Sequence, residues 1–397
     1  MTGSETPRGA SVVVIGGGVT GLSAAWWLAR DGVDVLVLDK GIVGWEASGR
    51  NGGGCSHYQS PLFAEEQRLW PMMDELLGYP TEHQSHKIIF GINQKQVDYY
   101  KYIAATIRSH GHQVDDLTGD DIRRLVPLAG PNALGGLYAH TGGQANPQRT
   151  VQAYAWALQD HGGRILQHTP VIGFERVGGA VTGVVTTRGV IGCDHVLVAA
   201  GPQGQQLMSL LDAHMPMAPA RAEMVVTEPC EIMPLRAVDG NGLYGRQTAR
   251  GNLAYGGGPH EWIDEVEPDG PKARPTSPLV RNLAARVAGL FPKAAHLRVI
   301  RSWAGVIETT PDGRPILDRL KDPGNVTVAT MSGVGFGLSP ASGHALRDLI
   351  MDGTCSFADI SKLGLDRFAG LEPDWRQRKG WFTEAAKEFS DPAVLAG

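Results

Sequence analysis

An apolar strand pattern, a glycine-rich turn, a helical pattern and a second strand pattern follow one another near the start of the chain. The first apolar run, 12–15, leads into Gly16, Gly18 and Gly21. In this motif the first glycine permits a tight turn, the second lets backbone approach a pyrophosphate, and the third lets the helix pack on the sheet. The spacing predicts a βαβ unit of a parallel sheet, with phosphate bound at the N-terminus of its helix.

An acid closes the second predicted strand. Asp39 follows the apolar run 35–38, close to the expected distance from Gly21. A carboxylate at this position accepts hydrogen bonds from the hydroxyls of an adenosine ribose, and it repels a 2′-phosphate. The motif therefore favours FAD or NAD over NADP.

Length and charge limit the remaining classes. The chain has 397 residues, a formal net charge of −5 and a pI near 6.2. It is long enough for two joined domains, and it lacks the basic field that binds nucleic acid or an anionic membrane surface. Its sequence contains no apolar run of the roughly 18 residues that a membrane span requires. We therefore expect a cytoplasmic protein, and the scattered cysteines and histidines predict no metal site.

Periodicity predicts a discontinuous α/β fold. Asn146 can cap a helix that has Pro147 at its first position, and strand patterns follow that helix. We expect a Rossmann-like nucleotide-binding domain with a parallel sheet, and a substrate domain made of a second, mostly antiparallel β-sheet plus helices. The nucleotide-binding domain is predicted at 11–80, 145–220 and 320–364, the substrate domain at 81–144 and 221–319, and a C-terminal extension at 365–397.

Several later segments resemble the D-amino-acid-oxidase superfamily, which includes glycine oxidase and the sarcosine oxidases. The run 44–53 is similar to its second FAD contact, and 196–201 is similar to its strand-to-glycine contact. The C-terminal motifs at 301–305, 310–315 and 333–337 are the most specific match. The resemblance covers residues 11 to about 355, and within the superfamily it points to the β subunit of sarcosine oxidase and to related opine or hydroxyproline dehydrogenase subunits.

This resemblance implies FAD and the residues that hold it. Other members attach the flavin through a cysteine where Gly305 stands or a histidine where Asn51 stands, so we expect noncovalent FAD. A glycine loop that opens a helix also suits the negative charge of a reduced flavin. Arg50 could instead be a surface charge. The predicted cofactor-binding residues are Gly16, Gly18, Val19, Thr20, Gly21, Asp39, Lys40, Ser48, Gly49, Arg50, Asn51, Gly52, Gly53, Val171, Ala200, Gly201, Gly305, Gly333, Gly335, Phe336, Gly337 and Leu338.

The reaction that the resemblance implies is oxidation of a C–N bond. Hydride passes from the substrate α-carbon to flavin N5, and the resulting imine is hydrolysed. The substrate would be a secondary amine, an N-substituted amino acid or a D-amino acid, and oxygen or a redox partner would accept the electrons. The alternative is a flavin subunit of a larger amino acid or opine dehydrogenase, and a third class is a flavoprotein that serves in binding or assembly.

Candidate catalytic residues are His57, Tyr255, Arg246 and Trp303. Many amino-acid-oxidising relatives have an arginine where this chain has Ile307, so either Arg221 or Arg246 holds a substrate carboxylate or the substrate has none there. His57 could act as a base or orient the amine, although both His57 and Trp303 are compatible with core positions. Further candidate substrate contacts are Tyr58, Tyr244, Gln247 and His260. Tyr244 and Arg246 should share one strand face and Gln247 the other.

Overall fold

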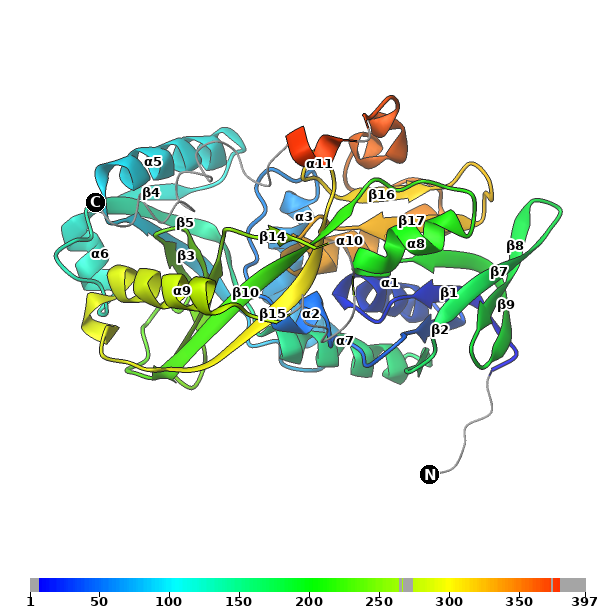
Figure 1. Cartoon of the computed structure of the whole chain (residues 1–397), viewed down its shortest axis with the longest axis horizontal. Coiled ribbons are helices and arrows are strands. Elements are labelled where there is room, and N and C mark those ends of the chain that lie inside the picture. The colour runs from blue at the N-terminus through cyan, green and yellow to red at the C-terminus, as the bar shows by residue number, and fades with distance from the viewer. Residues whose placement is uncertain (1–6, 264–265, 267–273, 373, 379–397) are drawn as a thin grey trace.

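The computed structural model describes residues 7–263, 266, 274–372 and 374–378. Two β-sheets, each covered by helices, lie at opposite ends of the molecule in Figure 1. The chain crosses between the sheets several times, so strands from distant parts of the sequence meet in each. The predicted α/β class with two sheets is confirmed. The exact domain boundaries stay a prediction.

The first sheet has a parallel centre. Its strand order is β16-β17-β9-β1-β2-β6, and the pairs within β17-β9-β1-β2-β6 are parallel. The β7–β8 hairpin extends from β9, and β16 adds an antiparallel edge. The bounds are β1 (Gly9–Ile15), β2 (Val35–Leu38), β6 (Arg164–Leu166), β7 (Val171–Val177), β8 (Ala180–Thr186), β9 (Gly189–Val198), β16 (Ile316–Arg319) and β17 (Val326–Thr330).

Alternating apolar residues give this sheet two buried faces. Val12 and Val14 of β1 pack with α1 (Val19–Arg30), α7 (Pro147–Asp160) and α10 (Gly335–Met351). The intervening Val13 and Ile15 enter a second core with α8 (Gly204–Ser209). A strand buried on both faces has a continuous apolar run, which is why 12–15 is recognisable in the sequence.

The second sheet is antiparallel except where β11 pairs with β3. Its order is β14-β10-β13-β12-β11-β3-β5-β4, and β15 pairs with β10. The bounds are β3 (Gln84–Gly91), β4 (Val114–Thr118), β5 (Gly135–Gln144), β10 (Ala218–Pro229), β11 (Val238–Gly240), β12 (Leu243–Gln247), β13 (Asn252–Gly257), β14 (Glu261–Trp262) and β15 (Val299–Thr309).

Helices cover both faces of the second sheet. One face packs against α6 (Gly119–Leu125) and α9 (Ser277–Leu290), and the other packs partly against α5 (Gln94–Ser109). Short helices and 3-10 turns complete the described chain. They are α2 (Ala47–Arg50), α3 (Phe63–Leu69), α4 (Met73–Leu77), α11 (Trp375–Arg378) and the 3-10 turns η1 (Trp70–Met72), η2 (Gly201–Gln203), η4 (Pro292–Ala294), η5 (Ser361–Leu363) and η6 (Leu365–Phe368).

The predicted cap of α7 is confirmed, because the Asn146 side-chain oxygen accepts a hydrogen bond from Arg149 N at 3.3 Å. Helix α10 begins at Gly335, within the glycine loop, and contains Pro340. Leu338 N donates to Val334 O, so the first helical hydrogen bond forms before the proline. Pro340 has no backbone N–H and therefore leaves out one later hydrogen bond. Residues 379–397 of the predicted C-terminal extension lie outside the described residues.

Candidate active site

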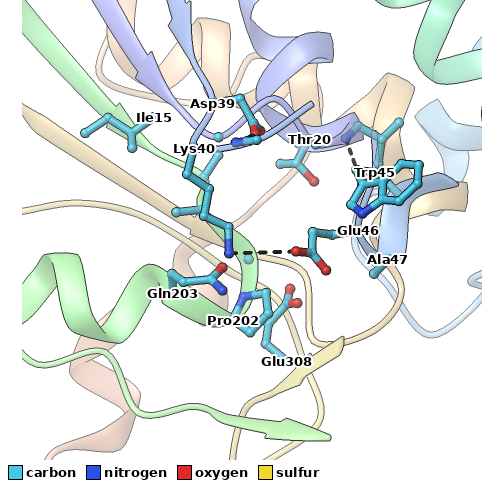
Figure 2. A pocket seen from close by; sticks show the side chains of 18 of the residues that line it. Ile15, Thr20, Asp39, Lys40, Trp45, Glu46, Ala47, Pro202, Gln203 and Glu308 are labelled. Atoms are coloured by element: carbon cyan, nitrogen blue, oxygen red, sulfur yellow. Dashed lines mark hydrogen bonds and ion pairs between the residues drawn. The ribbon is translucent and has the colours of Figure 1, made fainter. Parts of the chain in front are cut away.

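A cavity of about 920 Å³ opens at the carboxyl ends of the parallel strands. Its walls come from the turn after β1, the segment after β2, the start of β7, the segment after β9 and the N-terminus of α10. Figure 2 shows side chains from several of these segments pointing into the same space. The carboxyl edge of a parallel sheet is where such folds bind nucleotides.

The β1–α1 turn is held tightly by its glycines. Gly16 has φ +117°, and a Cβ there would lie 2.3 Å from the backbone oxygen of Ala199, just after the neighbouring strand β9. A Cβ on Gly21 would lie 2.0 Å from Gly16 O, so a side chain would force the helix off the turn. Gly18 is the N-cap residue of α1, and the first hydrogen bond of the helix runs from Leu22 N to Gly18 O. The backbone N–H groups of residues 19–21 therefore have no carbonyl partner within the helix.

Polar side chains surround that turn. Asp39 accepts hydrogen bonds from Gly17 N at 2.8 Å and from Gly41 N at 2.7 Å, while its carboxylate still lines the cavity. Ser48 Oγ accepts from Val19 N at 2.9 Å and so ties α2 to the turn. Lys40 Nζ lies 3.7 Å from a Glu46 carboxylate oxygen, and Figure 2 shows this ion pair beside Gln203.

The structure brings many of the predicted cofactor residues to this one cavity. Those that line it are Gly16, Gly18, Val19, Thr20, Asp39, Lys40, Ser48, Asn51, Val171, Ala200, Gly201, Gly333, Gly335 and Phe336. The predicted residues outside its lining are Gly21, Gly49, Arg50, Gly52, Gly53, Gly305, Gly337 and Leu338.

Several residues outside the lining act by letting segments approach each other. A Cβ on Gly49 would lie 2.3 Å from Gly44 O, and one on Gly53 would lie 2.1 Å from Ala145 O. Arg50 is not a free surface charge, because its guanidinium donates to Trp45 O at 2.6 Å and to Ala304 O at 3.1 Å. These contacts shape the loop that carries Ser48 and Asn51.

Sequence reasoning missed Glu308, which lines the cavity with its side chain almost fully buried. One of its carboxylate oxygens accepts from Thr330 Oγ1 and from Met331 N, each at 3.1 Å. Burial raises the pKa of Glu308 above its ordinary value, and these hydrogen bonds oppose the shift. Thr330 ends β17 and Met331 follows it, at the carboxyl edge of an apolar run that the sequence shows. No feature of the sequence marked Glu308.

The second sheet turns a polar face toward the glycine loop 52–54. Arg246 donates from Nη1 to Gly52 O at 2.9 Å, and a Cβ on Gly52 would lie 3.1 Å from the Tyr244 ring. Burial lowers the pKa of Arg246 to about 10. As predicted from strand alternation, Gln247 is on the opposite face, fully buried and bonded to backbone.

Tyr255 and Arg221 do not share this face. Tyr255 pairs with Gly245, lies fully buried in the core under α9, and donates its hydroxyl to Val238 O at 2.7 Å. Arg221 bonds Glu223 at 2.9 Å, and Glu223 in turn binds Thr276, the N-cap residue of α9. Both residues therefore belong to the helix-covered side of the sheet, and their positions do not support the roles suggested for them.

Trp303 and His57 have different partners. Trp303 Nε1 donates to Arg50 O at 2.8 Å. His57 Nδ1 lies 2.8 Å from a Glu66 carboxylate oxygen, and its side chain is 22% exposed. A Cβ on Gly337 would lie 2.2 Å from His57 Cε1, so the ring occupies the space that this glycine leaves.

The two remaining candidate substrate contacts are Tyr58 and His260, and neither lines the cavity. Tyr58 packs beside the core under α5, and burial raises the pKa of its phenol. The His260 ring lies 6.3 Å from the Tyr244 ring, and burial lowers the pKa of His260 to about 4.

Within the described ranges, no helix has both the length and the apolar character that a bilayer crossing requires. The same ranges contain no group of three or more His, Cys, Asp and Glu side chains that could hold a metal ion.

Comparison with known proteins gives consistent matches over nearly the whole chain. A family model described as "DAO: FAD dependent oxidoreductase" matches residues 11–349. The beta chain of sarcosine oxidase from Rhizobium meliloti (strain 1021), a subunit of that enzyme, is 27% identical, over 90% of this chain and 88% of the relative. An opine oxidase subunit from Rhizobium meliloti is also 27% identical, over 84% of this chain and 91% of the relative.

A solved structure has the same fold. L-proline dehydrogenase from P. horikoshii superposes with a TM-score of 0.82 at 24% sequence identity, and the match covers 92% of this chain and 99% of that one. This likeness concerns the arrangement of the two sheets and their helices.

Proposed function

The chain belongs to the FAD-dependent oxidoreductase family that matches residues 11–349, and on this premise we propose that it oxidises a C–N bond of a small amine or amino acid. The observation that carries the proposal is the meeting of two surfaces. The cavity reaches Asn51 and Phe336, and the polar strand face with Tyr244 and Arg246 contacts the adjoining residue Gly52.

The residues present fit FAD. Close backbone contacts at Gly16 and Gly21 leave a turn without side chains, and the Asp39 carboxylate lines the cavity beside it. N–H groups at the start of α1 suit a pyrophosphate, and carboxylate lone pairs that remain on Asp39 suit ribose hydroxyls. When bound, FAD supplies the acceptor for the two electrons and the hydrogen of the substrate's α C–H bond.

Noncovalent attachment suits this chain. Gly305 and Asn51, neither of which can form a bond to flavin, stand at the two positions where the family resemblance suggests a covalent anchor. Cys55 is buried and its sulfur lies 3.4 Å from Gly53 O, and burial raises the pKa of the thiol well above its ordinary value. A buried thiol of raised pKa is a poor nucleophile.

Arg246 is the proposed anchor for a substrate carboxylate. Among the described residues, its one hydrogen bond runs from Nη1 to Gly52 O, whereas a guanidinium carries five N–H donors. Its position beside the glycine loop would hold a carboxylate next to Asn51, and Tyr244 on the same strand face would flank the substrate. Bidentate pairing with a carboxylate is the geometry that arginine favours.

A second candidate is a flavin subunit that passes electrons to a partner chain. The observation that favours it is the similarity to two relatives whose names contain the word subunit. We further propose a cytoplasmic location, because the four cysteines are free, as in a reducing compartment.

The test is an anaerobic screen of the yellow, FAD-loaded protein against N-methyl amino acids, N-carboxyalkyl amino acids, D-amino acids and plain amines. Loss of visible flavin absorbance with at least one nitrogen compound is expected, and failure with all of them would favour a binding role. Readmitting oxygen then separates the two candidates. Rapid reoxidation with hydrogen peroxide indicates an oxidase, and persistent reduction until an artificial acceptor is added indicates a partner chain.

A further inference from the structure

His57 is held at a defined place between two elements. Its ring fills the space beside Gly337 in the first turns of α10, and a Cβ on that glycine would also lie 2.6 Å from Gly54 O. Trp70 Nε1 donates to Gly337 O at 2.6 Å and fixes the same turn from the other side. The imidazole is therefore packed between these segments, with 22% of the side chain exposed.

Glu66 reaches His57 from α3 and is completely buried, with 0% of its side chain exposed. One carboxylate oxygen lies 2.8 Å from His57 Nδ1, and the other accepts from the backbone N–H of His57 at 3.1 Å. Among the described residues, no other group hydrogen-bonds this carboxylate. Glu66 is thus dedicated to the orientation of a single residue.

We propose that Glu66 is a positioning residue that makes His57 the proton acceptor for the substrate amine. The inference deepens the proposed function and rests on it. Neither Glu66 nor His57 is among the residues that line the cavity, so cofactor binding does not explain the pair. The His57 ring adjoins the cavity at Gly337, the residue after the lining residue Phe336.

The chemistry follows from the hydrogen bonds. An ionised carboxylate can only accept, so the proton of neutral His57 resides on Nδ1 and faces Glu66. Nε2 is left as the acceptor, and no hydrogen bond from the described residues reaches it. A carboxylate bonded to one ring nitrogen fixes the tautomer and the orientation of the imidazole, as it does for imidazoles that bind metals.

A substrate amine is oxidised as the neutral form, whereas free amines carry a proton near neutral pH. His57 Nε2 takes that proton: one N–H bond of the ammonium breaks, an Nε2–H bond forms, and the lone pair stays on the substrate nitrogen. The resulting imidazolium is paired with Glu66. Arg246 and Lys87 lie near Gly53 and Gly54 in the loop before His57, and the charges of Glu66, Lys87 and Arg246 all act on Cys55.

The first test measures the protonation state of His57 itself. In nitrogen-15 NMR of histidine-labelled holoenzyme, with the His57 signal assigned by its loss in His57→Asn, the neutral ring should be protonated on Nδ1. A neutral ring protonated on Nε2 would overturn the proposal, whether or not any amine turns out to be a substrate.

The kinetic test compares Glu66→Gln with its neighbour Glu65→Gln on the same helix. Glu65 is also buried, but it bonds Arg68 and His344 rather than His57. Glu66→Gln should slow flavin reduction by the amine about 10- to 100-fold, and the loss should grow as the pH falls, because more substrate then arrives protonated. Glu65→Gln should not change that pH profile.

The double variant gives the decisive comparison. In the His57→Asn background, Glu66→Gln should have little further effect, since residues that act as a unit are not additive. Equal losses from Glu66→Gln with and without His57 would contradict a positioning role. If no amine reduces the flavin, the proposed function fails and the inference falls with it, and the NMR result then separately decides whether the His57–Glu66 geometry is correct.

Discussion

Two glycine-bearing helix N-termini face the same cavity, and their glycines serve different purposes. At the start of α1, Gly16 and Gly21 make room for backbone, since an added Cβ would strike Ala199 O or Gly16 O. At the start of α10, Gly337 makes room for the loop that carries His57, since an added Cβ would strike both the His57 ring and Gly54 O. The two turns meet, because a Cβ on Gly335 would lie 3.4 Å from Thr20 Oγ1.

This difference separates cofactor binding from catalysis. The α1 turn is built from residues close together in the sequence, and the role we propose for it is to hold the dinucleotide. The α10 turn packs against His57, and His57 is hydrogen-bonded to Glu66. Both residues lie far from residue 337 in the sequence, and the catalytic role we propose belongs to them. Substitutions at the first turn should therefore remove FAD, and substitutions at the second should leave FAD bound and impair its reduction.

The largest effect is expected from Gly21→Ala. The added methyl group would have to push the helix away from Gly16 O, and fixed backbone cannot yield as a side chain can. We expect the dissociation constant for FAD to rise about 100-fold or more. Equilibrium dialysis or quenching of flavin fluorescence measures it. Gly192→Ala on β9 is the matched control, because its added Cβ would be 3.5 Å from the nearest atom.

Gly337→Ala should separate the two functions. The methyl group would displace the His57 ring, so flavin reduction by a substrate amine should slow by about 100-fold, the scale of a lost general base. FAD affinity should change far less than in Gly21→Ala. Stopped-flow kinetics measures flavin reduction, and titration of the same preparation measures FAD affinity. An equal loss of FAD affinity in Gly337→Ala and Gly21→Ala would show that the two turns do not have separate roles.

Arg246→Ala should raise the dissociation constant of an amino acid substrate about 10- to 100-fold, because a charge-assisted hydrogen bond is lost. An amine without a carboxylate should bind as before. Arg221→Ala is the informative comparison, since Arg221 lies on the helix-covered face with Glu223. Loss of carboxylate selectivity in Arg221→Ala but not in Arg246→Ala would reverse the assignment.

The smallest effect concerns stability rather than rate. Burial raises the pKa of Glu308, so its ionisation opposes folding, and the penalty grows as the pH rises through the folded-state pKa. Below the unfolded pKa of about 4.3 the carboxyl is protonated in both states and the penalty is absent. Glu308→Gln should therefore raise the melting temperature of FAD-free protein more at pH 8 than at pH 5. Glu75→Gln on the protein surface controls for the loss of a negative charge.

The sequence predicted the α1 side of the molecule well because its constraints are local. Gly16, Gly21 and Asp39 are spaced by the geometry of one βαβ unit, and the doubly buried strand 12–15 is apolar throughout. Strands β3 and β5 escaped prediction because they mix polar and glycine residues on a half-buried sheet. The sequence also could not show that the Tyr255 side chain points into the core under α9, because this depends on which face of the sheet the helices cover.

The partners of the predicted site residues were harder still. Glu66 occupies a helix rich in acids, and nothing local distinguishes it from Glu65. Their different partners, His57 for one and Arg68 with His344 for the other, depend on how α3 lies between the two sheets. Contacts of this kind arise from tertiary packing and have no fixed spacing in the sequence.

The central claim is that this chain breaks the C–H bond next to a substrate nitrogen. Its most direct measurement is the anaerobic rate of flavin reduction by a substrate from the screen, with hydrogen and then deuterium on the α-carbon. We predict that the deuterated compound reduces the flavin several-fold more slowly at saturating concentration. Equal rates for the two compounds, in an enzyme whose flavin reduction is fully resolved from binding, would contradict the account.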